Sequence, residues 1–163
     1  IFYDRSCLMA KKVAKYSLVA FLSGTFIFDK IGFPSTVKGS SMEPTLKGID
    51  SKDSFLTIQD VVWVNRLKKN PEKLDTIVFI SPTNRHDMMI KRVIGVEGER
   101  VRFPKINDGK YFLIPKNYFC VGSDNINKNI VKDSSSFGAI PNGLIIGKAT
   151  HIIWPPNRWR KLI

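Results

Sequence analysis

After Pro34 the chain is made of short runs of β-branched and aromatic residues, each closed by Gly, Pro, Asn or Asp. The runs are 60–67, 75–81, 88–96, 99–104, 110–115, 118–124 and 144–154. Such runs are typical of β-strands, and no long segment after Pro34 has the 3.6-residue period of a helix. Asn107-Asp108-Gly109 is typical of a hairpin turn between two of them. The sequence therefore predicts a mainly β fold built from short strands.

An apolar stretch at 11–30 precedes this β-rich part. Its uninterrupted section, 16–28, is shorter than the about 20 residues that span a bilayer, but lysines at its two ends can extend to the headgroups. Basic residues come before it, which by the positive-inside rule places the rest of the chain across the membrane. We expect an N-terminal segment, 1–33, with one membrane anchor, and a β domain, 34–163. A cleaved signal peptide, an interfacial amphipathic helix and a buried helix of the domain are alternatives.

The composition fits one domain with a strongly basic surface. The chain has 163 residues, with 26 Lys and Arg against 14 Asp and Glu, and a net charge of +12. An anionic membrane or an acidic partner is consistent with this excess, and so is an ordinary basic surface. The basic residues are scattered, which argues against nucleic acid. Cys7 and Cys120 form no CxxC pair and no His lies at ligand spacing, so we expect free thiols, no metal and no cofactor.

A candidate nucleophile lies in GSSMEPTLKG, at 39–48. Ser40 and Ser41 are adjacent there, and Gly39 lets a substrate backbone approach closely. The backbone N–H groups around Ser41 can form an oxyanion hole. A plain surface loop is the alternative, and the choice depends on whether the chain offers a base for the serine.

The base can be a lysine whose pKa burial has lowered. The histidines suit the role less well, because His86 lies in a polar turn and His151 in an apolar strand, where structural roles are commoner. Lys91 lies inside the apolar run 88–96, and in a strand it shares a face with Met and Val neighbours. Lowering a lysine pKa from about 10.4 to 7–8 corresponds to roughly 3–5 kcal/mol. A strand edge with two solvated cations, Lys91 and Arg92, is the alternative.

Four boxes together resemble those of type I signal peptidases, in the family's order. They are Ser41-Met42-Glu43-Pro44-Thr45-Leu46, Leu74-Asp75-Thr76-Ile77-Val78-Phe79, Lys91-Arg92-Val93-Ile94-Gly95, and Gly122-Ser123-Asp124-Asn125 followed by Asp133-Ser134-Ser135-Ser136-Phe137-Gly138. The resemblance covers nearly all of the chain after Val37. The last part, ATHIIWPPNRWRKL at 149–162, is similar to the end of the mitochondrial inner membrane protease branch of that family, subunit 2 in particular.

The resemblance implies a signal-peptidase and LexA-like coiled antiparallel β-fold, with a Ser–Lys dyad close to a membrane. Ser41 is then the catalytic nucleophile, and neutral Lys91 is the general base. The residues that the resemblance assigns to the oxyanion and the substrate are Gly39, Ser40 and Met42. Those that it assigns to support of the dyad are Asp124, Asp133 and Ser134.

The implied function is that of a membrane-bound serine endopeptidase without a cofactor. It would remove sorting presequences from proteins delivered to the mitochondrial intermembrane space. Its partners would be those presequence-bearing proteins, the membrane and a sibling protease subunit in a heterodimer, with no nucleic acid. The protein would lie in the mitochondrial inner membrane, with its catalytic domain facing the intermembrane space.

Three positions depart from the family pattern. Gly39 stands where some members carry an oxyanion-donating serine, so donation here rests on backbone N–H groups. Ser135 stands where bacterial members have an Arg that pairs with the acid at Asp133. Val131 stands where many members have a serine that hydrogen-bonds the lysine. The sequence therefore leaves open which group orients Lys91.

Three other functions are compatible with parts of this pattern. A signal peptidase I of bacterial or plastid type would share the boxes. A LexA-like self-cleaving regulator would share the Ser–Lys chemistry, but it should carry a DNA-binding helix-turn-helix where this chain has an apolar segment. A non-catalytic basic β module on an anionic membrane would tolerate replacement of Ser41 and Lys91.

Overall fold

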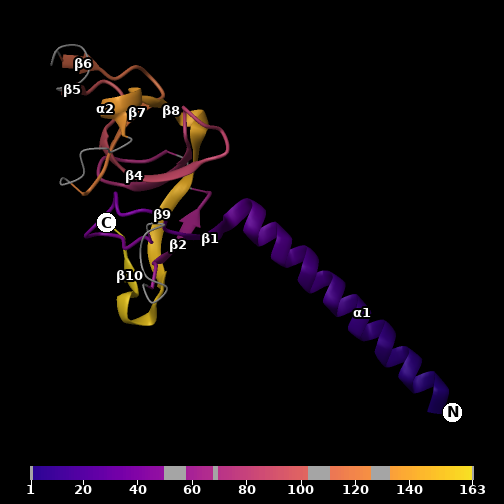
Figure 1. Cartoon of the computed structure of the whole chain (residues 1–163). Helices are drawn as coiled ribbons and strands as arrows, with labels where there is room; N and C mark the ends of the chain where they lie inside the picture. The colour runs from indigo at the N-terminus through magenta and orange to yellow at the C-terminus, as the bar shows by residue number, and fades with distance from the viewer. Residues whose placement is uncertain (1, 50–57, 68–69, 103–110, 126–132, 163) are drawn as a thin grey trace.

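In the computed structural model, a β-rich body carries one long helix that projects away from it (Figure 1). The structure describes residues 2–49, 58–67, 70–102, 111–125 and 133–162, with side chains from Met9 onward except Ile27. The helical elements are α1 (Phe2–Phe26), the π-helical η1 (Ile27–Ile31), α2 (Ser134–Phe137), and the 3-10 turns η3 (Asn142–Leu144) and η4 (Pro156–Arg158). The strands are β1 (Gly32–Thr36), β2 (Val61–Asn65), β3 (Thr76–Ile80), β4 (Met88–Gly95), β5 (Arg100–Arg102), β6 (Tyr111–Leu113), β7 (Tyr118–Gly122), β8 (Ile140–Pro141), β9 (Ile145–Trp154) and β10 (Arg160–Lys161).

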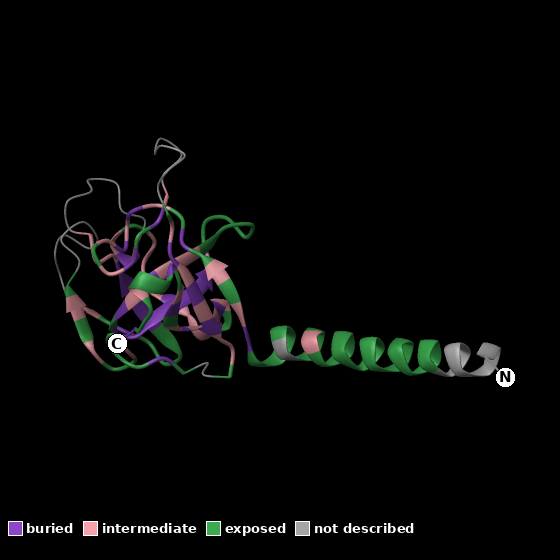
Figure 2. Ribbon diagram, turned by 90° about the horizontal axis from the view of Figure 1, so that it is seen from below, coloured by how far each residue is buried: buried purple, intermediate pink, exposed green. Residues whose placement is uncertain are grey.

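The helix α1 presents its apolar side chains to the outside (Figure 2). Val13, Leu18 and Phe21 are each more than half exposed, so α1 is not the buried helix of the domain that was one alternative. Within the described residues, no helix combines the length and the apolar character needed to cross a membrane. The membrane anchor in segment 1–33 stays a prediction.

One large antiparallel sheet forms the body, in the order β1-β2-β9-β3-β4-β7-β8, with β10 paired to β9. The long strand β9 joins its parts, because it pairs with β2 along one section and with β3 along another. Register shifts interrupt both pairings, and such bulges bend a strand and increase its twist. The sheet therefore curls, and β5 and β6 form a separate two-stranded sheet at its side (Figure 1).

The predicted runs each contain a strand, and the mainly β prediction is confirmed. The sequence did not predict β1, β8 and β10. In β1, Pro34 interrupts the pattern, but proline is tolerated there because β1 is the edge strand and needs no donor on its outer side. The predicted turn at 107–109 lies outside the described residues. The strands on either side of it, β5 and β6, pair in antiparallel register, as a hairpin requires.

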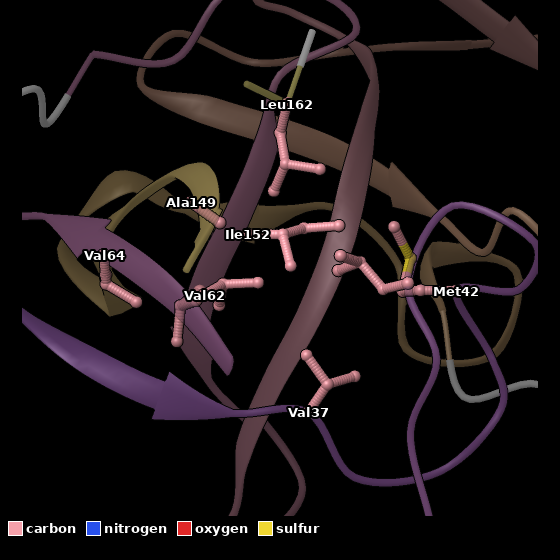
Figure 3. Packing of buried hydrophobic residues seen from close by; sticks show 9 residues of the cluster. Val37, Met42, Val62, Val64, Ala149, Ile152 and Leu162 are labelled. Carbon is pink, nitrogen blue, oxygen red and sulfur yellow. The ribbon is translucent and has the colours of Figure 1, made fainter. Parts of the chain in front are cut away.

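The largest buried cluster lies between the first strands and the loop 39–48 (Figure 3). Its strand members come from β2, β3 and β9, and include Val62, Val78 and Ile152. The loop contributes Met42 and Leu46, which are 1% and 0% exposed. Apolar packing against the core therefore fixes the loop that carries the two serines.

Replacing Leu46 with Ala should lower the free energy of unfolding by about 2–5 kcal/mol, because it removes a fully buried side chain and leaves a cavity. Urea unfolding at equilibrium measures the change. Leu67→Ala is the matched control, since Leu67 is 68% exposed, and should change the value by less than about 0.5 kcal/mol. Equal values for the two variants would contradict the packing of the loop.

Candidate active site

Ser41 lies in a tight turn that follows β1. The N–H of Glu43 donates to the carbonyl oxygen of Ser40 at 3.2 Å, and the N–H of Leu46 donates to that of Met42 at 2.8 Å. Met42 packs in the core, whereas the neighbouring Ser41 is half-buried and lines a cavity. The backbone N–H of Ser41 has no hydrogen-bond partner within the described part of the chain, and is open to a substrate oxygen.

Gly39 is required by the shape of this turn. Its φ is +72°, a conformation that side chains disfavour. It also lies against Gly48 at the other end of the loop, where a Cβ on Gly48 would be 2.1 Å from the Gly39 carbonyl oxygen. The N–H of Gly39 donates to the carbonyl oxygen of Ile49 at 3.1 Å. The two glycines therefore close the loop at its base, two residues before Ser41.

Lys91 occupies the middle of β4, with its side chain on the buried face of the strand. It is 3% exposed, and this burial lowers the pKa of the amine to about 8, although the carboxylates of Asp133 and Asp124 pull it upward. The amine Nζ donates a hydrogen bond to the Oγ of Ser123 at 2.8 Å. A lysine in this state is substantially neutral in mildly alkaline solution and can accept a proton.

Ser41 and Lys91 line the same cavity, which has a volume of about 410 Å³. The lining also includes the buried Val62 and Val78 and the exposed His86. Within the described residues no hydrogen bond joins the Ser41 hydroxyl to the amine directly. This is common before substrate binds, since catalytic hydrogen bonds tighten in the substrate complex. The cavity thus brings a serine and a neutralisable amine to one space.

Asp124 connects the lysine strand to the serine loop. Its carboxylate accepts two hydrogen bonds from Arg92, at 2.8 and 2.7 Å, and one from the hydroxyl of Thr45. Burial alone would raise the pKa of Asp124, but the hydrogen bonds from Arg92 and Thr45 hold it below its ordinary value. Next in the chain, Asn125 donates from its backbone to the Ser41 carbonyl oxygen and from its side chain to that of Ser40, at 3.0 and 2.9 Å.

Asp133 and Ser134 hold the short helix α2 in place. Asp133 is the N-cap of α2, where its carboxylate accepts from the N–H of Ser135 at 2.9 Å and also from the Ser135 hydroxyl. Ser134 is fully buried, and its Oγ accepts from the N–H of Val121 at 2.8 Å. In this chain Ser135 therefore donates to the Asp133 carboxylate, from the position where bacterial relatives are expected to have an arginine.

Of the expected site residues, Ser41 and Lys91 line the cavity. The others do not line it and lie in the neighbouring segments: Gly39 and Ser40 in the serine loop, Asp124 after β7, and Asp133 and Ser134 at the start of α2. The side chain of Met42 lies in the core and not against the cavity, so a substrate can meet only its backbone. Sequence reasoning also missed Ser123 and Asn125 as contacts of the dyad. The signal for Ser123 was the hydroxyl inserted just before Asp124, in a box otherwise written Gly-Asp-Asn. Val131, where a serine was expected, lies outside the described residues.

The family model described as "Signal peptidase, peptidase S26" matches residues 9–110, which is more than half of the chain and includes both Ser41 and Lys91. The chain therefore belongs to the signal peptidase family, peptidase S26.

Several similar proteins are mitochondrial inner membrane protease subunits. Mitochondrial inner membrane protease subunit 2 of Danio rerio is 32% identical over 88% of this chain and 80% of its own length. Subunit 2 of Mus musculus is 34% identical over 91% and 87%, and that of Saccharomyces cerevisiae is 37% identical over 76% and 68%. These similarities confirm the predicted resemblance, and with it an enzyme of the signal-peptidase type, a serine endopeptidase.

Removing the hydroxyl of Ser123 should change how activity depends on pH. In Ser123→Ala the Lys91 ammonium loses an acceptor, so its pKa falls below about 8 and the acid limb of the kcat/KM profile moves to lower pH. Its kcat should fall roughly tenfold, because the amine is less well oriented. Ser123→Thr keeps the hydroxyl and should retain the original midpoint. An unmoved midpoint in Ser123→Ala would show that this contact does not act on the base.

Lys91 should also lower the stability of the protein at neutral pH. Its pKa is about 8 when folded and about 10.5 when unfolded, so the penalty is complete below pH 8 and disappears as the pH rises to the unfolded value. Lys91→Met should therefore raise the free energy of unfolding at pH 7 by up to about 3 kcal/mol, with little gain near pH 10.5. Urea unfolding at the two pH values measures it. Lys116→Met, at an exposed lysine, is the control, and the same gain there would refute the assignment.

Proposed function

We propose that this chain is the catalytic subunit of a mitochondrial inner membrane protease that removes sorting presequences by Ser–Lys chemistry. The observation that carries the proposal is the shared cavity of Ser41 and Lys91, with the amine buried and its pKa lowered to about 8. Family membership and the names of the relatives support the same reaction class. The assignment of the two residues as nucleophile and base is our own.

The first half of the reaction forms an acyl-enzyme. The neutral amine of Lys91 takes the proton of the Ser41 hydroxyl as the oxygen attacks the scissile carbonyl. The developing oxyanion is stabilised by the open backbone N–H of Ser41 and its neighbours. As the C–N bond breaks, the Lys91 ammonium gives its proton to the leaving amine, and the new N-terminus departs.

The second half returns the enzyme to its starting state. Lys91, neutral again, takes a proton from a water molecule that attacks the ester carbonyl. The ester bond to Ser41 then breaks, and the proton returns to the serine oxygen. Ser123 holds the amine in position through both halves, since its Oγ accepts from Nζ in the free enzyme.

An open strand edge beside Lys91 suits an extended peptide substrate. Strand β7 pairs with β4 only from Arg92 onward, so the first half of β4 has no neighbour on that side within the described residues. The N–H of Val93 donates to the carbonyl oxygen of Asp75, and its carbonyl oxygen accepts from Leu74, both just before β3. By alternation the backbone groups of Met88 and Ile90 therefore face the other, open edge. Both residues line the cavity that contains Ser41. A substrate strand added there would pass the nucleophile.

The proposals for the partner subunit and for the location of the catalytic domain rest on the names of the relatives. Their names describe subunits of an inner membrane protease, and we infer that this chain likewise works in a complex, as a heterodimer with a sibling subunit. The catalytic domain would face the intermembrane space, where its presequence-bearing substrates arrive. The excess of 26 basic over 14 acidic residues is compatible with an anionic membrane surface.

Presequence cleavage by the intact protein with its sibling subunit tests the proposal. Ser41→Ala and Lys91→Met should each lower kcat/KM by at least about a thousandfold, because each removes one member of the dyad. His86→Gln is the control for a histidine that lines the same cavity, and should cut within about threefold of the unmutated chain.

The outcomes separate three interpretations. Loss of cutting in both dyad variants, with folding and partner binding kept, supports the proposal. Loss in His86→Gln with activity in Lys91→Met would make the histidine the base. If the sibling alone cuts and the unmutated chain adds nothing, a non-catalytic binding subunit is the better description.

A further inference from the structure

The chain ends in a stretch that Ser–Lys chemistry does not use, Trp154-Pro155-Pro156-Asn157-Arg158-Trp159-Arg160. The structure folds this stretch back onto the loop that carries Ser41. The guanidinium groups of Arg158 and Arg160 both donate to the carbonyl oxygen of Thr45, at 3.3 and 2.7 Å. Two cations therefore converge on a backbone atom only four residues from the nucleophile.

A buried carboxylate fixes the position of Arg158. Asp60 is 0% exposed, and its two oxygens accept from Nε and Nη2 of Arg158, each at 2.9 Å. The same carboxylate accepts from the N–H of Lys47 at 2.8 Å, so it also grips the loop directly. An isolated carboxylate is expensive to bury, and the pairing keeps the guanidinium in one orientation. The contact with Thr45 is thus imposed by a rigid partner.

Thr45 passes this restraint on to the base. Its carbonyl oxygen is held by the C-terminal arginines, and its hydroxyl donates to Asp124, which is clamped by Arg92. Arg92 is the neighbour of Lys91 in β4, and Ser123, the acceptor of the Lys91 amine, is the neighbour of Asp124. The C-terminal stretch, the serine loop and the lysine strand are therefore joined through one residue.

We propose that Arg158, held by Asp60 and assisted by Arg160, is a positioning residue that sets the serine loop against the lysine strand through Thr45. This role rests on the proposed Ser–Lys function. It predicts that the C-terminal arginines act on the rate of the chemical step and only weakly on peptide binding, since neither of them lines the cavity.

The test compares Arg158→Lys and Arg158→Met with Lys161→Met in the intact protein with its sibling subunit. Arg158→Lys keeps the charge and loses the two-pronged contact with Asp60, which lysine cannot make. Both Arg158 variants should lower kcat about tenfold or more, leave KM within about twofold, and leave the midpoint of the acid limb unmoved. Lys161→Met removes an exposed cation from β10, three residues after Arg158, and should cut like the unmutated chain.

Chemical rescue and hydrogen exchange separate positioning from general stability. Ethylguanidinium added to Arg158→Ala should restore part of the lost kcat, by filling the place of the side chain. In Arg158→Lys the amide of Lys47 should exchange at least about tenfold faster, while Tm stays close to that of the unmutated chain. Unchanged kcat per folded molecule, or unchanged exchange at Lys47, would overturn the positioning role.

Failure of the proposed function gives a different result. In that case the unmutated chain cuts no better than Ser41→Ala, and the Arg158 variants show no further decrease in kcat. The exchange measurement still decides the inference, because faster exchange at Lys47 supports the restraint of the loop by Arg158. Unchanged exchange overturns it.

Discussion

A lysine that is to act as a base near neutral pH has to be kept from water, and the remainder of the site is organised by this constraint. Lys91 meets it by standing in the middle of β4, where the face it shares with Val93 is buried. Full burial without a partner would leave an amine with nothing to orient it. The hydroxyl of Ser123 supplies that partner as a neutral group, which directs the amine without restoring the charge that a carboxylate in contact would favour.

The nucleophile poses the opposite problem, because it has to be accessible and still be held in place. The turn of Ser41 is open on one side, and contacts at its other residues define its position. Met42 and Leu46 anchor it in the core, and Asn125 bonds to its backbone at two points. Rigid support of this kind lets a half-buried side chain keep a defined direction. These contacts limit the mobility of Ser41 through its backbone and leave its hydroxyl free for the substrate.

Much of this was predictable from the sequence, and the parts that were not share a physical cause. Short runs of β-branched and aromatic residues predicted most of the strands, and a lysine inside one of them indicated a buried amine. Pro34 concealed β1, because only the edge position makes a proline acceptable there. The role of Met42 was not visible, since a residue next to a nucleophile can face either the core or the substrate. Contacts such as Ser123 with Lys91, or Arg158 with Asp60, join residues far apart in the chain, and a single sequence carries no record of such pairs.

The partly unpaired edge of β4 affects whether copies of the protein associate with one another. Unpaired strand edges are sites where sheets grow from one molecule into the next. Here β7 covers the edge from Arg92 onward, and among the described residues only the few before it are left without a neighbouring strand. So short a length can hold a passing peptide by a few hydrogen bonds, but it offers too little backbone to template a stable intermolecular sheet. The short unpaired edge that can bind a peptide transiently thus also protects the protein against aggregation through this edge.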